Sequence, residues 1–319
     1  MNIHNDDTSL ENRGDEVREL LAGLSREQKS VSPKYFYDKR GSELFDRICA
    51  LPEYYLTRTE IEIMRMHAGD MARQIGPGAG VIEFGIGSGL KTELLLEALE
   101  SPASFVPVDI SEKHLAQTAE ALSLRFPSLE VRPVTADFTQ RFAIPGTAAE
   151  PRRNLVYFPG STIGNFASET ALGLLRIMRE KAGAKGQLLI GIDLVKPRDD
   201  LLRAYNDSQG VTAQFNLNLL ECLNREFGAN FKCDNFRHEA IYDEKHDRIE
   251  MRLVSLARQQ VELAGKTVEF DQGERLRTEF SHKYRVQDFR EMASKAGFKW
   301  RDGWFDRRKW FAVLLFESR

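Results

Sequence analysis

The sequence predicts an α/β protein, with a doubly wound parallel sheet and an inserted α+β domain. Between residues 80 and 195, short and almost continuously apolar runs alternate with stretches of helical periodicity. Strands of a parallel sheet that is covered on both faces have this composition, and the helices between them form the covering layers. The alternation stops at Pro197, after which the pattern favours antiparallel strands and separate helices. Glycines that follow the first apolar run add a candidate ligand-binding turn.

Residues 33–75, which precede the sheet, have helical patterns. Ser42 is suited to cap the run ELFDRICAL, and Thr57 with Glu60 forms a capping box ahead of a second helix. We therefore expect helices whose amino-terminal ends lie at Ser42 and Thr57.

The apolar runs predict the strands of the sheet and the stretches between them predict its helices. The strand candidates are GVIEFGIG, SFVPVDI, EVRPVTADF, NLVYFPGS and GQLLIGIDLV, and the helix candidates are KTELLLEALE, SEKHLAQTAEALSLRF and SETALGLLRIMREKAG. Beyond Pro197, residues 198–228 have helical periodicity and residues 236–283 alternate like strands. A helix near 286–296 and a Trp/Phe-rich hairpin then follow, and we expect the C-terminal strands to return to the sheet.

Composition excludes several classes of function. The 319 residues are 42% hydrophobic and 29% charged, with a net charge of −3 and no Lys/Arg-rich run, so nucleic acid is not an expected partner. No apolar stretch approaches the ~20 residues of a membrane helix, and the polar, acidic N-terminal stretch does not resemble a secretory signal. Cys49, Cys222 and Cys233 lack metal-ligand spacing, so we expect no metal and a cytoplasmic protein with reduced thiols.

The stretch EFGIGSGLKT places Gly85, Gly87 and Gly89 at the end of the first predicted strand. A dinucleotide-binding fingerprint requires a glycine where Leu90 stands, and so does a P-loop. The spacing G-x-G-x-G after Glu83 instead resembles the first motif of class I S-adenosylmethionine-dependent methyltransferases.

Acidic residues at the ends of the next two strands support a nucleotide-like ligand. Asp109 lies roughly 20 residues past the glycines, where an acid accepts hydrogen bonds from ribose hydroxyls. Asp137 and Phe138 end the third strand and suit an adenine amino group and ring face. We therefore expect S-adenosylmethionine as the methyl donor, whose reactive chemistry belongs to its sulfonium group.

The substrate side differs from that of enzymes that methylate base amines. Those enzymes carry an Asp/Asn-Pro-Pro-aromatic motif after the fourth strand, whereas this chain has FPGSTIGNF with Asn165. From residue 30 to residue 290 the chain closely resembles the histidine-specific Nα-methyltransferases, which convert L-histidine to the trimethylated betaine hercynine in ergothioneine biosynthesis. The segments that carry the resemblance are YFYDKRGSELFDRICALPEYYLTRTE, GSTIGNF, IDLVKP, AYNDSQGVTAQFN, RIEMRL and TEFSHKY.

The resemblance implies a class I methyltransferase domain with an auxiliary substrate domain. The auxiliary domain would comprise residues 1–60 and 197–284, and the methyltransferase domain residues 61–196 and 285–319. The implied substrate is L-histidine, the implied cofactor is S-adenosylmethionine, and the expected assembly is a monomer.

The resemblance also implies roles for individual residues. Asn165 and Tyr205 would hold the substrate carboxylate, Gly160 would line the position of the amine, and Tyr37 would lie near the amine through water. The imidazole would be bound by Tyr54, Glu279 and Ser281, with Met251 packing its pocket. The cofactor would contact Tyr37, Gly85, Lys91, Asp109, Asp137 and Phe138.

Residues 277–284, RTEFSHKY, predict how histidine is selected. If they form a strand, Glu279 and Ser281 share one face, and Thr278 and Phe280 share the other. A neutral imidazole offers one donor and one acceptor, which a carboxylate and a hydroxyl can both satisfy. Glu279 and Ser281 are therefore predicted to select histidine.

Two other functions stay open at this level. The chain could methylate another amino acid such as tryptophan or a derivative, although an indole has only one N–H to offer Glu279. It could also be a non-catalytic S-adenosylmethionine-binding regulator, although a full set of substrate residues disfavours that. A methyl-transfer assay on free amino acids separates these cases.

Overall fold

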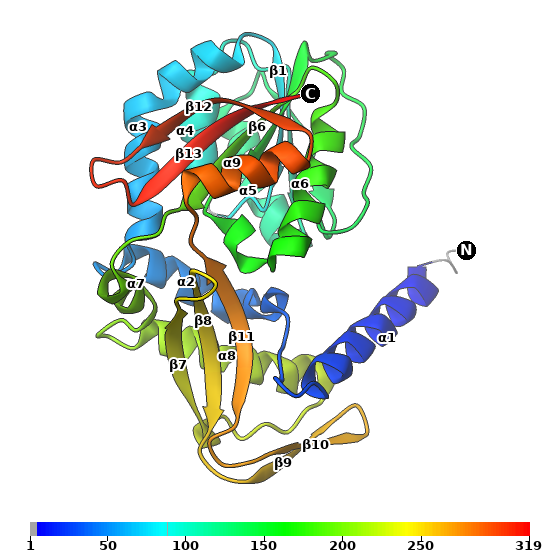
Figure 1. The fold of residues 1–319 in the computed structure, drawn as a ribbon. Coiled ribbons are helices and arrows are strands. Elements are labelled where there is room, and N and C mark those ends of the chain that lie inside the picture. The colour runs from blue at the N-terminus through cyan, green and yellow to red at the C-terminus, as the bar shows by residue number, and fades with distance from the viewer. Residues whose placement is uncertain (1–4, 88) are drawn as a thin grey trace. The chain divides into compact units, whose positions relative to one another are not determined.

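The computed structural model describes residues 5–87 and 89–319 (Figure 1). The chain forms two compact units. Unit 1 comprises Met1–Tyr54 and Pro197–Ser281, and unit 2 comprises Tyr55–Lys196 and His282–Arg319.

Unit 2 is built on a sheet with the strand order β12-β13-β6-β5-β1-β2-β3, in which β4 also pairs with β2. Its strands β1, β2, β5 and β6 are mutually parallel, and β12 and β13 are antiparallel additions at one edge. The strands are β1 (Ala79–Phe84), β2 (Ser104–Asp109), β3 (Glu130–Val131), β4 (Val134–Thr135), β5 (Arg153–Phe158), β6 (Gln187–Asp193), β12 (Phe298–Phe305) and β13 (Phe311–Ser318). The predicted doubly wound sheet is therefore confirmed, and the C-terminal strands do return to it.

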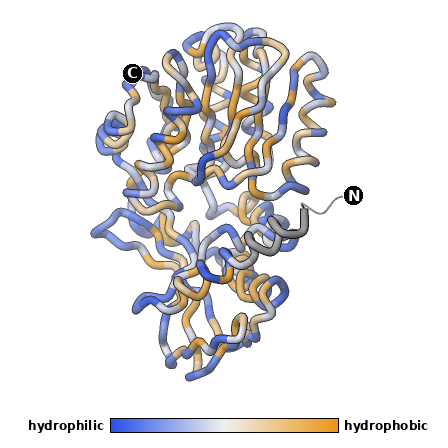
Figure 2. The backbone as a smooth tube through the Cα atoms, turned by 90° about the vertical axis from the view of Figure 1, so that its right-hand side faces the viewer, coloured by the Kyte–Doolittle hydropathy of each residue, from blue (hydrophilic) through white to orange (hydrophobic). Residues whose placement is uncertain are grey.

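Helices cover both faces of this sheet because successive strand residues point to opposite sides. One face packs Val81 and Leu155 against the helices α3 (Tyr55–Ile75), α4 (Leu90–Ala98) and α5 (Glu112–Arg125). The other face packs Ile82 and Val156 against α6 (Ser168–Ala182) and α9 (Val286–Lys295). Figure 2 shows that the strands of the sheet are largely hydrophobic, as two-sided burial requires.

Unit 1 combines helices with a small sheet of strand order β11-β8-β7 and a separate β9-β10 hairpin (Figure 1). Helices α7 and α8 contact β7 and β8, and α2 packs against α8. The elements are α1 (Asn5–Leu24), η1 (Pro33–Phe36), α2 (Lys39–Ala50), α7 (Arg198–Tyr205), α8 (Val211–Phe227), η3 (Cys233–Asn235), β7 (Phe236–Asp243), β8 (Arg248–Ser255), β9 (Gln259–Leu263), β10 (Lys266–Phe270) and β11 (Arg275–His282). The second part of unit 1 begins at Pro197, where the sequence predicted that the alternation of strands and helices stops.

Three local predictions are wrong. Helix α2 begins earlier than expected, because Asp38 is its N-cap and accepts a hydrogen bond from Gly41 N at 2.6 Å. Helix α3 begins at Tyr55, so Thr57 and Glu60 lie inside it and form no capping box. The predicted third strand is divided into β3 and β4, between which Pro133 has no N–H to donate to a strand ladder.

Among the described residues, no helix combines the length and hydropathy needed to cross a membrane. The same residues contain no group of three or more His, Cys, Asp and Glu side chains arranged to hold a metal ion.

Candidate active site

The predicted glycine turn follows β1 in unit 2. Gly85, Gly87 and Gly89 have φ values of 74°, 53° and 76°, which favour glycine because other residues are strained there. Gly85 N donates to the carbonyl of Val108 at 2.8 Å, which ties the turn to the end of β2. A Cβ on Gly85 would lie 3.6 Å from the Phe138 ring, so the structure brings these two predicted cofactor residues together.

The two predicted cofactor acids each shape a turn with one oxygen. Asp109 Oδ1 accepts from Ser111 N at 2.9 Å, and Asp137 Oδ1 accepts from Thr139 N at 2.9 Å. Such bonds are typical of Asx turns. No described residue is bonded to Oδ2 of either acid, so Oδ2 is available to a ligand hydroxyl or amino group. The Phe138 ring packs at a tilt against Phe84 and edge-on against Phe158, with centroid distances of 5.6 Å and 5.8 Å.

The segment between β5 and α6 carries Gly160 and Asn165, which lies at the end of the 3-10 helix η2 (Thr162–Asn165). Its shape is fixed from within unit 2. Ser161 has a φ of 56°, and its Oγ accepts a hydrogen bond from Asp193 N at 2.9 Å. A Cβ on Gly164 would lie 2.9 Å from the His282 carbonyl oxygen, so the segment packs closely against that backbone.

Asp193, at the end of β6, is the centre of a buried charge cluster. Its carboxylate forms ion pairs with Lys196 and Lys283 and accepts a hydrogen bond from the Tyr55 hydroxyl at 2.7 Å. Burial alone would raise the pKa of Asp193, but the two lysines hold it below its ordinary value. Burial also lowers the pKa of Lys196 to about 8. The cluster holds the end of β6, which in turn holds Ser161.

Lys91, a predicted cofactor residue, lies in the first turn of α4 and is paired with Glu60 of α3. Its Nζ donates to Glu60 Oε2 at 2.8 Å. Both oxygens of the Glu60 carboxylate also accept from Gly160 N, at 3.0 and 2.9 Å. This role of Glu60 was not predicted from the sequence. The sequence did contain a signal, because the helical spacing places Glu60 on the same face as the apolar residues Ile63 and Met64. In the structure that face is buried, and Glu60 is only 1% exposed.

Glu83, which precedes the glycine turn, is completely buried. Its Oε2 accepts from the Thr92 hydroxyl at 2.7 Å, while its Oε1 has no partner among the described residues. Burial raises the pKa of this carboxyl to about 8. At neutral pH Glu83 is therefore mostly protonated and uncharged.

In unit 1 the structure places Tyr54 and Ser281, predicted to bind the imidazole, beside Tyr205, which is predicted to hold the substrate carboxylate. The rings of Tyr54 and Tyr205 lie 6.1 Å apart in an edge-to-face arrangement, and the Tyr205 hydroxyl is 2.7 Å from Ser281 Oγ. Burial raises the pKa of the Tyr54 phenol well above its ordinary value, and the nearby Tyr205, Cys49 and Glu279 act in the same direction. Tyr54 therefore stays protonated and can donate a hydrogen bond.

Tyr37 belongs to the same aromatic group. Its ring lies 5.8 Å from that of Phe45, which is 6.3 Å from the ring of Tyr54. Phe45 was not predicted as a site residue, and its place in the middle of an amphipathic helix gave no signal that distinguishes it from a core residue. Met251, on β8, is 2% exposed and pairs with Ala240 of β7, so it does lie in a packed apolar environment.

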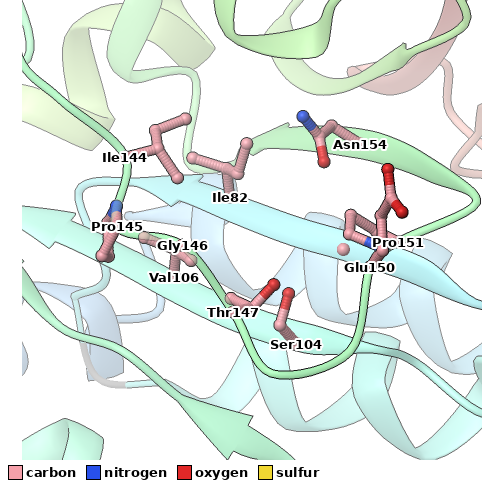
Figure 3. Close-up of a pocket in the computed structure, with 11 residues that line it drawn as sticks. Ile82, Ser104, Val106, Ile144, Pro145, Gly146, Thr147, Glu150, Pro151 and Asn154 are labelled. Carbon is pink, nitrogen blue, oxygen red and sulfur yellow. The ribbon is translucent and has the colours of Figure 1, made fainter.

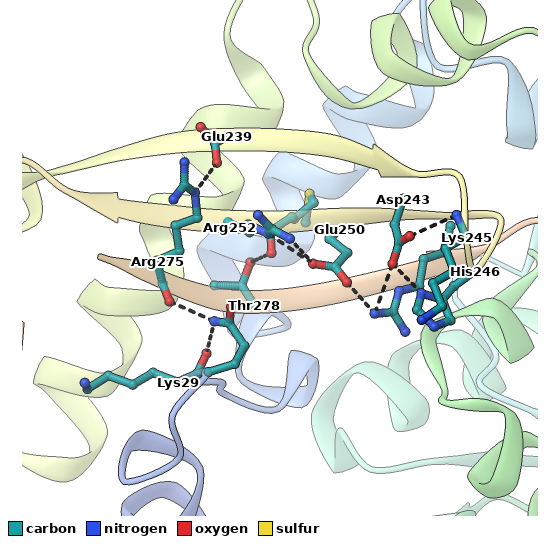
Figure 4. Close-up of polar contacts among 12 residues, drawn as sticks. Lys29, Glu239, Asp243, Lys245, His246, Glu250, Arg252, Arg275 and Thr278 are labelled. Carbon is teal, nitrogen blue, oxygen red and sulfur yellow. Dashed lines mark hydrogen bonds and ion pairs between the residues drawn. The ribbon is translucent and has the colours of Figure 1, made fainter. Parts of the chain in front are cut away.

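Thr278 and Phe280, which were predicted to share one face of β11, have different surroundings. Thr278 is buried and its Oγ1 donates to Asn216 Oδ1 of α8 at 2.7 Å. Phe280, expected in the same environment, instead stacks between the guanidinium groups of Arg248 and Arg277, at 3.9 and 4.3 Å from its ring centroid. Glu250 forms ion pairs with Arg248 and with Arg252, and Figure 4 shows Arg252 beside it.

A cavity of about 460 Å³ lies elsewhere in unit 2. It is lined by Ile82, Ser104, Val106 and Asn154 on the strands and by the loop at 144–151 (Figure 3). None of the predicted site residues lines it. Ligands of open α/β sheets bind outside the carboxyl ends of the strands, which is where the glycine turn and the two acids lie.

The chain is similar to known proteins along most of its length. A family model described as "Histidine-specific methyltransferase, SAM-dependent" matches residues 16–318. The chain is 39% identical over 304 residues to the histidine N-alpha-methyltransferase of Mycobacterium tuberculosis, covering 93% of each chain. It is 31% identical over 290 residues to ergothioneine biosynthesis protein 1 of Neurospora crassa, covering 89% of this chain and 32% of that protein. It is 30% identical over 204 residues to the 4-dimethylallyltryptophan N-methyltransferase of Claviceps purpurea, covering 60% of this chain and 59% of that one.

Proposed function

Because the chain belongs to the family of histidine-specific, S-adenosylmethionine-dependent methyltransferases, we propose that it methylates the α-amino group of L-histidine. We further propose that it transfers three methyl groups and yields hercynine, as in the first step of ergothioneine biosynthesis. The relative from Neurospora crassa, by its name a protein of ergothioneine biosynthesis, supports this assignment.

The observation that carries the proposal is the polar group in unit 1. Tyr54, Tyr205 and Ser281 adjoin one another, and Glu279 is close enough to influence the pKa of Tyr54. Glu279 would accept the imidazole N–H, while a hydroxyl would donate to the other ring nitrogen. Covering the half-buried Glu279 carboxylate with a side chain that offers no donor would cost free energy, so apolar side chains of similar shape would be rejected.

The residues of unit 2 fit S-adenosylmethionine. The Gly85 turn allows close approach of a ligand to the backbone, the available Oδ2 atoms of Asp109 and Asp137 suit ribose and adenine groups, and the Phe138 ring offers an apolar face. The Lys91 ammonium suits the carboxylate of the cofactor. When bound, the cofactor supplies a methyl group on a sulfonium centre.

The remaining roles concern the substrate backbone. Asn165 and Tyr205 are assigned to the substrate carboxylate, Gly160 to the lining of the amine position, and Tyr37 to a water-mediated contact with the amine. An α-amino group has a reference pKa near 8, so an appreciable fraction is neutral at neutral pH and a strong base is not required. Catalysis then depends chiefly on holding the nitrogen in position.

Successive methylations remove the N–H groups of the amine. Binding of the substrate through three methyl transfers must therefore depend on its carboxylate and its imidazole, which do not change. For this reason substitution of Asn165 or Glu279 should slow each of the three methyl transfers.

The test is incubation with S-adenosylmethionine and each of the twenty amino acids separately, followed by mass spectrometry. We expect histidine alone to gain up to three methyl groups, and the mono- and dimethylated forms to be converted to the same product. Accumulation of a monomethylated product would contradict trimethylation, and no methylation of histidine would contradict the function itself.

A second candidate is N-methylation of a tryptophan derivative, which the name of the relative from Claviceps purpurea raises. An indole would leave one side of the Glu279–Ser281 pair unsatisfied, because it has a single N–H and no acceptor nitrogen. The same twenty-amino-acid assay, extended to a prenylated tryptophan, distinguishes the two.

We also propose that the protein acts as a monomer in the cytoplasm. No disulfide joins Cys49, Cys222 and Cys233 to one another, which suits a reducing compartment. Size-exclusion chromatography with light scattering and cell fractionation test the two parts.

A further inference from the structure

Glu60 connects two predicted parts of the active site within unit 2. Its carboxylate pairs with Lys91 Nζ at 2.8 Å, and both of its oxygens accept a hydrogen bond from Gly160 N. Lys91 and Gly160 are also direct neighbours, because a Cβ on Gly160 would lie only 3.2 Å from Lys91 Nζ. One carboxylate therefore fixes a lysine from α4 and a peptide group from the segment after β5.

The pairing leaves Lys91 able to bind a ligand. An ammonium group has three donors, and Glu60 uses one of them. The Lys91 side chain is 20% exposed, whereas that of Glu60 is 1% exposed. Glu83 does not compete as an anion, because its raised pKa leaves it mostly neutral at neutral pH. Glu60 is thus the acid that pairs with Lys91.

The surrounding fold makes room for this carboxylate. A Cβ on Gly191 of β6 would lie 2.2 Å from Glu60 Oε1, so only glycine is compatible with the observed position of Glu60. A buried ion pair adds little to stability compared with an apolar pair of the same shape. Stability alone therefore gives no reason to place Glu60 on the apolar face of α3.

We propose that Glu60 is a positioning residue, which holds Lys91 and the Gly160 peptide in one arrangement and thereby sets the affinity for the methyl donor. The inference rests on the proposed function in one respect, namely that Lys91 contacts the cofactor. Glu60 itself acts through Lys91 and Gly160.

The first test compares Glu60→Gln with Glu62→Gln, an identical change at an exposed position of the same helix. Glutamine can still accept from Gly160 N, but it loses the charge that pairs with Lys91. Calorimetric titration with S-adenosylhomocysteine in the absence of histidine should give a Kd about ten- to a hundredfold higher for Glu60→Gln, because bonds to charged groups have that strength. Glu62→Gln should bind as the parent protein does. Equal Kd values for both variants would overturn the proposal.

A second comparison separates positioning from a merely structural role. If Glu60 acts through Lys91, the variant Lys91→Met and the double variant Lys91→Met/Glu60→Gln should bind S-adenosylhomocysteine within about twofold of each other. The double variant carries no unpaired buried charge, so it keeps the test valid even if Glu60→Gln alone does not fold. Much weaker binding by the double variant than by Lys91→Met would overturn the proposal.

Steady-state kinetics give a third readout. Glu60→Gln should raise KM for S-adenosylmethionine more than it lowers kcat, because it retains the acceptor for Gly160 N. Gly191→Ala, which displaces the carboxylate without removing it, should affect both parameters. Because the binding tests need no histidine, they judge Glu60 even if the amino-acid assay rejects histidine as the substrate.

Discussion

Replacing Glu83 by Gln is expected to change how the stability of the protein depends on pH. The carboxyl group is completely buried, and only one of its oxygens has a hydrogen-bond donor among the described residues, Thr92 Oγ1. Burial therefore favours the neutral form and raises its pKa from 4.5 to about 8. Glutamine keeps the shape and can still accept from Thr92, but it has no proton to lose.

The sign follows from proton counting. Between pH 4.5 and 8 the folded protein holds a proton on Glu83 that the unfolded chain has released. The stabilising effect of this proton is fully present below the unfolded-state pKa and is lost as the pH rises through the folded-state pKa. The loss is about 1.4 kcal/mol per pH unit over most of the window, and about 2 kcal/mol between roughly pH 6 and pH 8.

The assay is urea-induced unfolding of the parent protein and of Glu83→Gln at a series of pH values. Other titrating groups cancel in the difference between the two unfolding free energies, which should shift by about 2 kcal/mol in favour of the variant from roughly pH 6 to pH 8. Glu62→Gln, an exposed control on α3, should show no such trend. A difference that stays constant with pH would refute the reasoning, because it would mean that Glu83 has the same protonation state in both forms of the chain.

Three further changes probe the candidate active site. Glu279→Ala should reduce kcat/KM for histidine by about a hundredfold or more, with little change for bulkier apolar amino acids; equal losses on all substrates would exclude a selector role. Asn165→Ala should raise KM about tenfold for every amino acid that is accepted, since a hydrogen bond to the substrate carboxylate is lost, and an unchanged KM would exclude that contact. Gly164→Ala places a Cβ 2.9 Å from the His282 carbonyl oxygen. The unfolding free energy should therefore fall by about 1–3 kcal/mol, and activity should fall with it. A denaturation midpoint equal to that of the parent would show that the segment between β5 and α6 accommodates the methyl group without strain.

The fold was predictable because its signals are local. Uninterrupted apolar runs such as GQLLIGIDLV leave few alternatives to buried parallel strands, and β6 indeed pairs with β5 in parallel. The prediction of one continuous third strand was wrong, because Pro133 lacks the backbone N–H that would donate a hydrogen bond to a neighbouring strand. The predicted first residues of the helices were wrong for a different reason. Several residues near each helix start can serve as N-cap, and the local sequence does not favour Asp38 over Ser42.

The candidate site was predictable only where its residues are consecutive or follow a motif. The glycine turn, Asp109 at the end of β2 and Asp137 after β4 follow such local patterns. The bond between Tyr205 and Ser281 joins positions 76 residues apart, and Glu60 is 100 residues from Gly160. Periodicity places each of these side chains on a face of its helix or strand, but it cannot say which distant group that face meets.

Three buried acids in unit 2 show why the polar parts of the site resist local reasoning. Asp193, Glu60 and Glu83 are each at most 1% exposed, and each would raise the free energy of the folded state if left charged and alone. Asp193 is balanced by two lysines, Glu60 by Lys91 and a backbone N–H, and Glu83 by remaining protonated. The three solutions differ in how accessible the partner is, because the Lys91 side chain is 20% exposed whereas those of Lys196 and Lys283 are at most 1% exposed. Under the proposal that Lys91 contacts the cofactor, the Glu60–Lys91 pair is the point at which the interior of unit 2 would influence cofactor binding.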